Sequence, residues 1–262
     1  MLTSVQIREA FHVLLLREIG PPMQLALRLK GGVNLRLFFG SVRYSEDMDL
    51  DADARLREQL RGRMRAIMQA PPFRPRLRAL GVELDIPARP SKDTETVLRH
   101  KLGLVVGGVR YPTKVEISFR PMAPGLTPVL EAPPSQAVGD YLEPGQRFEP
   151  TGHYDHHSAV QQKIVALASR SEVQARDVFD LAMLIDLRPG DLDLRRLRSS
   201  LSDELLARAH DRIFEIGVDM FRDQVADYLA PEIRDATQAR WDDARIDAAT
   251  LLDTIRQSHV DS

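Results

Sequence analysis

The sequence contains no cysteine, which excludes disulfide bonds, thiolate metal sites and cysteine nucleophiles. Aromatic residues make up only 6% of the 262 residues, and there is one tryptophan. No apolar run approaches the roughly 20 residues of a membrane-spanning helix. The apolar stretch at residues 11–16 is flanked by charge and followed by no small-residue cleavage site. We therefore expect a globular protein in the cytoplasm, with no membrane partner and no obvious export signal.

Lysine is also scarce, and the charge is unevenly distributed along a chain whose formal net charge is -2. Residues 52–80 hold eight arginines against two acidic residues, whereas residues 201–262 hold 14 acidic residues against seven arginines. A basic segment attracts polyanions such as RNA. An amphipathic helix with a solvated arginine face gives the same pattern, so both interpretations of residues 52–80 stay open.

The hydrophobic pattern predicts an α+β protein with two parts. Residues 1–120 alternate helix and strand signals and form the predicted α/β domain, which includes a strand at 47–51 and a helix at 53–69. Residues 121–151 contain seven prolines and are expected to be an irregular linker. Residues 152–262 are expected to form a helical domain. Its predicted helices lie near 156–170, 175–187, 193–209, 211–229 and 232–257.

The most informative local pattern is a pair of aspartates behind a glycine turn. Alternate side chains of a strand share one face, so Asp47 and Asp49 are expected to stand about 7 Å apart. Two such carboxylates repel each other unless a cation lies between them, and carboxylate oxygens are preferred ligands of Mg²⁺. Gly31 and Gly32 lie upstream and lack a Cβ, so the backbone there can approach a phosphate, and the helix that follows points its N–H groups at an anion. Acidic turns and helix caps also contain Asp-x-Asp, but the combination predicts a nucleotide and metal site.

Two motifs, one at residues 25–51 and one at residues 157–185, resemble the motifs of a known family. The resemblance is to the AbiEii/AbiGii nucleotidyltransferase toxins of type IV toxin–antitoxin systems, which include the MenT toxins and belong to the DNA polymerase β-like superfamily. It covers residues 25–51 and 157–185. The residues that carry it are Lys30-Gly31-Gly32 with Leu35, Arg43 with Ser45-Glu46-Asp47 and Asp49-Leu50, Lys163 with Ala166-Leu167, and Arg176-Asp177 with Asp180-Leu181.

The resemblance implies a polymerase β-like nucleotidyltransferase domain followed by a helical domain. It also implies transfer of a nucleoside monophosphate from a nucleoside triphosphate, CTP or another pyrimidine first, to a tRNA 3′ end. Pyrophosphate is released, and the modified tRNA can no longer be aminoacylated, which stops growth. A cognate antitoxin is the expected protein partner, and no DNA partner is expected.

Roles for single residues follow from the motif and the resemblance together. Asp47 and Asp49 are expected to hold two Mg²⁺ ions, with Glu116 as a third carboxylate on a neighbouring strand, unless Glu116 is a surface residue of an edge strand. Asp51 either joins their face or caps the next helix. The nucleotide is expected to contact Lys30, Gly31, Gly32, Arg43, Ser45 and Lys163. For Ser45, bracing of the acidic strand is the alternative.

The family resemblance further implies that Lys163 and Asp177 complete the catalytic site. Without it, Asp177 and Asp180 would be interpreted as the solvated start of a helix. The cluster at residues 153–157 favours a helix start over a zinc site, because its spacing matches no ligand pattern. Two other functions stay open. One is nucleotidylation of a protein or a small molecule such as an aminoglycoside, and the other is an inactive nucleotide-binding or antitoxin-interacting module.

Overall fold

The computed structural model describes residues 2–20, 23–187 and 192–258. Its internal contacts divide the chain into two compact units. The sheet unit comprises residues 1–40, 44–122 and 128–154, and the helical unit comprises residues 41–43, 123–127 and 155–262. These ranges differ from the predicted 1–120, 121–151 and 152–262, because most of the proline-rich segment folds with the sheet unit.

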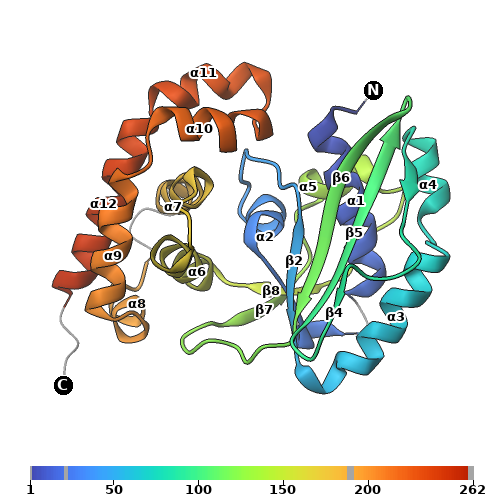
Figure 1. Cartoon of the computed structure of the whole chain (residues 1–262), viewed down its shortest axis with the longest axis horizontal. Coiled ribbons are helices and arrows are strands. Elements are labelled where there is room, and N and C mark those ends of the chain that lie inside the picture. The colour runs from blue at the N-terminus through green and yellow to red at the C-terminus, as the bar shows by residue number, and fades with distance from the viewer. Residues whose placement is uncertain (1, 21–22, 188–191, 259–262) are drawn as a thin grey trace. The chain divides into compact units, whose positions relative to one another are not determined.

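A mixed β-sheet forms the centre of the sheet unit, which confirms the predicted α+β class (Figure 1). The strand order is β3-β5-β6-β2-β1-β8-β7, with β4 paired to β5 on the same side as β3. Strand β2 is antiparallel to β1 and parallel to β6, and β5 and β6 form a hairpin. The strands are β1 (Leu27–Lys30), β2 (Met48–Ala52), β3 (Glu83–Asp85), β4 (Lys92–Asp93), β5 (Val97–Val106), β6 (Val109–Ser118), β7 (Pro128–Glu131) and β8 (Thr151–Tyr154).

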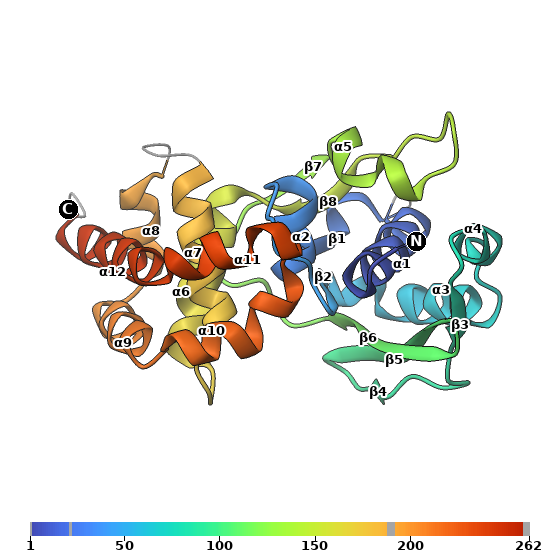
Figure 2. The same cartoon turned by 90° about the horizontal axis from the view of Figure 1, so that it is seen from above.

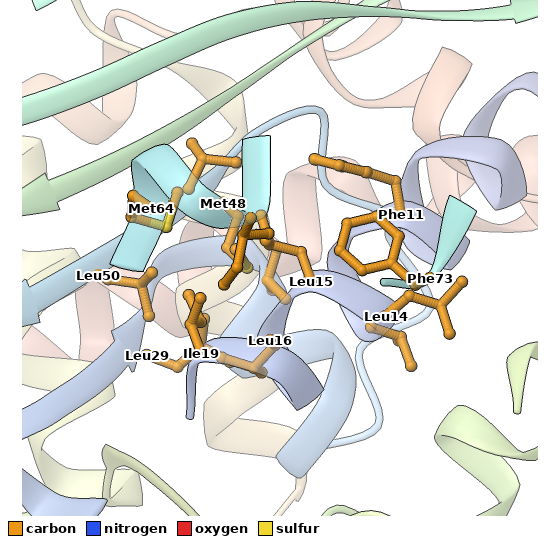
Figure 3. Packing of buried hydrophobic residues seen from close by; sticks show 14 of the residues in the cluster. Phe11, Leu14, Leu15, Leu16, Ile19, Leu29, Met48, Leu50, Met64 and Phe73 are labelled. Carbon is orange, nitrogen blue, oxygen red and sulfur yellow. The ribbon is translucent and has the colours of Figure 1, made fainter. Parts of the chain in front are cut away.

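Helices cover one face of this sheet and bury an apolar core there. Helix α1 (Ser4–Ile19) begins with a capping box in which Thr3 and Gln6 bond each other's backbone N–H groups. Its apolar residues pack between β1, β2 and α3 (Arg57–Gln69), as Figure 3 shows for Leu15, Met48 and Met64. Residues of β2 alternate between buried and half-buried, so one face of the strand belongs to the core and the other is polar.

The proline-rich segment is ordered where an irregular linker was expected. Pro128 begins β7, a strand with only one partner in the described sheet, where a residue without an N–H is tolerated. All four residues of β8 are buried, so its sequence shows no alternation that would reveal a strand. The remaining short elements of the sheet unit are η1 (Gln24–Ala26), α2 (Gly31–Phe38), η2 (Ala54–Leu56), α4 (Arg74–Ala79), α5 (Ser135–Val138) and η3 (Gly139–Tyr141).

The helical unit is built around α6, α7, α9 and α12, in which α6 and α12 each pack against both α7 and α9 (Figure 2). The predicted helices at 193–209 and 211–229 are wrong in their bounds: Ser202 caps a new helix, which continues past 209 to Phe214, and the next helix begins only at Val218. The predicted helix at 232–257 likewise breaks at Arg240. The elements are α6 (His156–Ser169), α7 (Ala175–Leu187), α8 (Leu194–Ser200), α9 (Asp203–Phe214), α10 (Val218–Gln224), η4 (Ala226–Tyr228), α11 (Pro231–Ala239) and α12 (Trp241–Gln257). No helix in the described part of the chain has the length and apolar character needed to span a membrane.

Candidate active site

The polar face of the sheet brings charged residues from four strands into one row. Asp49 of β2 is paired in register with Lys30 of the antiparallel β1 and with Glu116 of the parallel β6. Glu116 is in turn paired with Arg99 of β5. Residues in register on neighbouring strands point to the same face, so these four side chains lie side by side. The row therefore places two adjacent carboxylates, Asp49 and Glu116, between two basic side chains, Lys30 and Arg99.

Asp47 and Asp49 converge on one cation, the ammonium group of Lys114 on β6. The Lys114 Nζ atom lies 3.2 Å from Asp47 Oδ2 and 3.8 Å from Asp49 Oδ1. Both carboxylates are about one-third exposed, at 32% and 37%, so they are reachable from solvent. Burial raises the pKa of Asp47 and Lys114 lowers it, and with the further repulsion of Asp49 and Glu46 the pKa is raised overall. The two aspartates form a pair that needs a cation.

The glycine turn lies beside Asp49 of this pair. Gly31 begins α2 after the extended Lys30, and its φ of 66° lies in the left-handed region that favours glycine. A Cβ at this position would stand 3.6 Å from Asp49 Oδ2. The first turn of a helix carries unpaired N–H groups that attract anions. A helix start and a carboxylate pair thus lie close enough to contact one phosphorylated ligand.

Hydrogen bonds fix the short segment that carries Asp47. The Ser45 hydroxyl donates to the Asp47 carbonyl over 2.8 Å, and the Thr113 hydroxyl donates to the Glu46 carbonyl over 2.7 Å. Burial, together with Arg8, lowers the pKa of His12 to about 3, so its ring is neutral. Since Thr113 has given its only proton to Glu46, its oxygen accepts from His12 Nε2, 2.9 Å away. In this structure Ser45 braces the acidic segment.

Asp51 shares the face of Asp49, but its carboxylate is fully engaged. Its Oδ1 accepts from Lys30 Nζ over 2.6 Å, and its Oδ2 accepts from the Tyr154 hydroxyl over 2.9 Å. The cap of the next helical turn is Asp53, whose side chain accepts from the Arg55 N–H. Lys30 is therefore held beside the site by Asp51, at the N-terminal end of α2.

Glu116 lies next to Asp49, on an interior strand of the sheet. Its Oε2 accepts from Arg99 Nε over 2.5 Å. Within the described part of the chain, no three His, Cys, Asp or Glu side chains gather with the geometry of a metal site. Asp47 and Asp49 suit a hard divalent cation, because both supply carboxylate oxygens and both already contact one positive charge, the ammonium group of Lys114. A role for Glu116 as a third ligand stays a prediction that requires the Arg99 contact to open.

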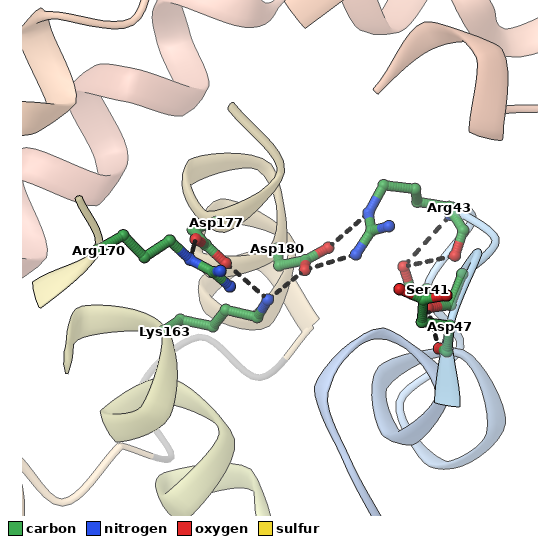
Figure 4. A network of polar contacts seen from close by, with 8 residues as sticks. Ser41, Arg43, Asp47, Lys163, Arg170, Asp177 and Asp180 are labelled. Carbon is green, nitrogen blue, oxygen red and sulfur yellow. Dashed lines mark hydrogen bonds and ion pairs between the residues drawn. The ribbon is translucent and has the colours of Figure 1, made fainter. Parts of the chain in front are cut away.

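The second motif forms a buried charge network in the helical unit (Figure 4). Lys163 Nζ on α6 lies 3.0 Å from Asp177 Oδ1 and 2.6 Å from Asp180 Oδ2 on α7. Arg43 donates to both oxygens of Asp180 over 2.9 and 2.7 Å, and Arg170 donates to Asp177 over 2.6 Å. Both aspartates have no exposed surface, so they are not the solvated helix start that their position suggested.

Charge balance explains how this network is tolerated. Burial by itself would raise the pKa of Asp177 and Asp180, but the cations around them outweigh burial and lower both pKa values. Three cations face two carboxylates, which leaves one positive charge. Lys163 uses two of its three N–H groups on the aspartates. Contact of Lys163 or Arg43 with a nucleotide, and catalysis by Asp177, stay predictions.

A groove of about 590 Å³ in the sheet unit begins at Asp47. Asp47 lies on one side of it, and Arg99, Lys101, Arg110 and Lys114 line it from the β5–β6 hairpin. Lys101 makes no ion pair with any residue that the structure describes. The groove therefore combines the acidic residues Glu46 and Asp47 with a basic wall.

Most arginines of the segment at 52–80 are engaged within the sheet unit, and three of them are paired with carboxylates. Five of its eight arginines bind acidic side chains or carbonyl groups, namely Arg55, Arg57, Arg61, Arg63 and Arg76. Only Arg65, Arg74 and Arg78 keep guanidinium groups without such a partner among the described residues. Arg57, Arg61 and Arg63 thus tie α3, and Arg76 ties α4, to neighbouring segments of the sheet unit.

Sequence reasoning missed Lys114 and Arg99. Both lie on the half-buried face of the β5–β6 hairpin, where isolated basic residues on strands are unremarkable. One signal was present: Lys114 and Glu116 alternate with the buried Val115 and Ile117, which places both on the polar face. That cue identifies the face, but it does not say which strand lies alongside.

Comparisons with known proteins identify the family of this chain and agree with its fold. A family model described as "Nucleotidyl transferase AbiEii toxin, Type IV TA system" matches residues 14–257. The fold is similar to that of JHP933 from Helicobacter pylori, with a TM-score of 0.52 and 18% identity over 97% of this chain and 92% of that one. An H. pylori protein described as a candidate nucleotidyltransferase is similar too, with a TM-score of 0.50 and 18% identity over 98% of this chain and 96% of that one. The search of curated proteins found no match. Because the family model spans most of its length, this chain belongs to the AbiEii nucleotidyltransferase toxin family of type IV toxin–antitoxin systems.

Proposed function

We propose that the protein transfers a nucleoside monophosphate from a nucleoside triphosphate to the 3′ end of a tRNA, in a reaction that depends on Mg²⁺. The observation that carries this proposal is the convergence of Asp47 and Asp49 on a single cation, next to the start of α2 at Gly31. Family membership supports the transfer reaction itself. The tRNA acceptor, the metal and a preference for CTP rest on the resemblance and on the charges described above.

The chemistry would be an in-line displacement at the α-phosphorus. The 3′ oxygen of the acceptor forms a bond to that phosphorus, and the bond to the oxygen that bridges to the β-phosphorus breaks, which releases pyrophosphate. Mg²⁺, when bound, supplies charge neutralisation and lowers the pKa of the attacking hydroxyl.

The chain's own residues would bind and orient the reactants. Asp47 and Asp49 would hold the metal, and the backbone N–H groups at Gly31 and Gly32 would bind phosphate oxygens. Lys114, which contacts both carboxylates, would bind a phosphate oxygen instead. Glu116 either ligates the metal or accepts the proton of the attacking hydroxyl. Positioning and charge neutralisation account for most of the rate enhancement in transfers of this kind.

The test of the transfer reaction is incubation with total tRNA, Mg²⁺ and each α-labelled nucleoside triphosphate in turn, followed by a denaturing gel. We expect label in tRNA, lost by at least a factor of 100 in Asp47→Asn and in Asp49→Asn. Asp140→Asn is the matched control, since this aspartate of the sheet unit is exposed and its carboxylate has no partner among the described residues. Label in protein or in an added aminoglycoside would instead identify another acceptor. If Asp47→Asn and Asp49→Asn both transfer label at the rate of the unchanged protein, the assignment of these aspartates to the active site is refuted.

The basic groove supplies the test of the acceptor. A protein that neutralises phosphates releases counterions, so tRNA affinity should fall steeply with salt. We expect Lys101→Gln to weaken tRNA binding and to reduce the salt dependence by about one phosphate contact. Lys92→Gln on β4 is the matched control, because Lys92 is exposed and lies outside the groove. Equal effects of the two variants would exclude the groove as the RNA site.

Membership in a type IV toxin–antitoxin family implies an antitoxin partner. Growth arrest on expression, relieved by the product of an adjacent reading frame, is the observation that tests this partner. A cytoplasmic location fits a tRNA acceptor and stays a prediction.

A further inference from the structure

A second and larger cavity, of about 760 Å³, lies in the sheet unit away from the aspartate pair. Its walls are one side of α3, the segment that leads from β3 to β4, and the beginning of β5. On α3 the lining residues follow helical spacing, at 61, 65, 68 and 69. The volume falls within the range of roughly 300–1,000 Å³ that is typical of small-molecule sites.

This cavity lies on the opposite face of the sheet from Asp49. Leu98 and His100 of β5 line it, whereas Arg99 between them points to the polar face and binds Glu116. Alternate residues of a strand point to opposite faces, so the sheet itself separates the cavity from the aspartate pair. The cavity and the groove at Asp47 are thus different spaces, which share only Pro87 among the residues that line them.

Three arginines give the cavity its charge. The guanidinium groups of Arg65, Arg74 and Arg89 make no hydrogen bond or ion pair with any described residue. The two acidic residues of the lining are already paired, Asp93 with Arg61 at 2.6 Å and Asp85 with Arg110 at 2.7 Å. Planar guanidinium groups match phosphate oxygens, and these three have no other partner in the described chain.

The inner wall of the cavity is apolar except for one imidazole. Met68, Leu84 and Leu98 line it, and His100 beside them is only 7% exposed. The His100 ring makes no hydrogen bond with a described residue, although buried polar groups are normally paired. Burial lowers the pKa of His100, and the opposing effect of Asp93 does not reverse this, so the ring is neutral and offers one donor and one acceptor.

We propose that this cavity is a second nucleotide-binding site, which takes a nucleoside triphosphate without turning it over. The phosphates would bind Arg65, Arg74 and Arg89, and the base would lie on the apolar wall with a polar edge at His100. A base is planar, largely apolar on its faces and polar at its edge, which matches a wall of this composition. The proposal does not depend on the proposed transfer reaction, because none of these residues belongs to the aspartate site.

The experiment is a calorimetric titration with ATP, and then with CTP, of the full-length Asp47→Asn/Asp49→Asn variant in the presence of EDTA. Failure of the transfer reaction leaves this measurement unaffected. We expect binding of one of the two nucleotides, weakened at least tenfold by adding Arg65→Gln and Arg89→Gln. A matched pair, Arg78→Gln and Lys92→Gln, removes two exposed charges outside the cavity and should change the affinity less than twofold.

The base contact has its own test. Tripolyphosphate should bind at least tenfold more weakly than the nucleotide, and His100→Phe should reduce that difference while binding of tripolyphosphate stays the same. The proposal is overturned if neither nucleotide binds, if tripolyphosphate binds equally well, or if the matched pair weakens binding as much as the arginine pair. It is also overturned if only an RNA oligonucleotide binds.

Discussion

Replacing Asp180 with asparagine tests the charge network that joins α6, α7 and Arg43 in the helical unit. The carboxylate has no exposed surface and accepts from Lys163 over 2.6 Å and from Arg43 over 2.7 and 2.9 Å. Asparagine keeps the shape but removes the charge, which leaves an excess of buried positive charge. Removing one partner of a buried ion pair costs about 3–5 kcal/mol. We expect the free energy of unfolding of the helical unit to fall by this amount.

The assay is urea denaturation followed by tryptophan fluorescence. Trp241 is the only tryptophan of the sequence, it lies on α12 in the helical unit, and it is 2% exposed, so it reports on this unit. Asp186→Asn is the control, because Asp186 lies on the same helix but is exposed and has no ion pair among the described residues. If both variants lose the same stability, the network does not stabilise the fold as argued.

Acid provides an independent check of the same network. The pKa values of Asp177 and Asp180 are lowered in the folded state. The contribution of the two carboxylates to folding stability is therefore fully present above the ordinary aspartate pKa. It is lost as the pH falls through the lowered folded values. We expect Asp180→Asn to reduce this acid-induced loss of stability. An unchanged pH dependence in the variant would contradict the assignment.

Three further predictions concern the sheet unit. Gly31→Ala should cost about 1–2 kcal/mol of stability, since its φ of 66° strains any residue with a Cβ. Gly62→Ala within α3 is the control and should not lower the stability. Denaturation curves of the two variants test this difference. Burial raises the pKa of the metal-free Asp47, so a proton competes with Mg²⁺ for this carboxylate; as the pH is lowered, the Mg²⁺ concentration needed for half-maximal transfer should begin to rise while the pH is still above the ordinary aspartate pKa, which Mg²⁺ titrations at several pH values check. Thr113→Val should lower kcat, because the Glu46 carbonyl loses its hydrogen-bond donor. An unchanged kcat would show that this hydrogen bond is not needed to position Asp47.

Local patterns were sufficient for much of the fold and for the centre of the candidate site. Periodicity predicted α1, α3, the β5–β6 hairpin and most helices of the helical unit, because each buries one face of its own sequence. It failed for β7 and β8, where an edge strand tolerates proline and a fully buried strand shows no alternation. The helix breaks at Ser202 and Arg240 were missed because apolar residues continue at helical spacing on both sides.

The sequence by itself determined which residues could act. The glycines at 31 and 32, the aspartates at 47 and 49, and the second motif around Lys163 are contiguous patterns whose chemistry can be recognised without knowing their neighbours. Only the tertiary structure decided which charges meet. Lys114 lies between Asp47 and Asp49, and Arg43 binds Asp180 across 137 positions of the chain, because strand register and helix packing bring them together. A strand's own sequence shows which face a side chain occupies but not which strand or helix lies beside it.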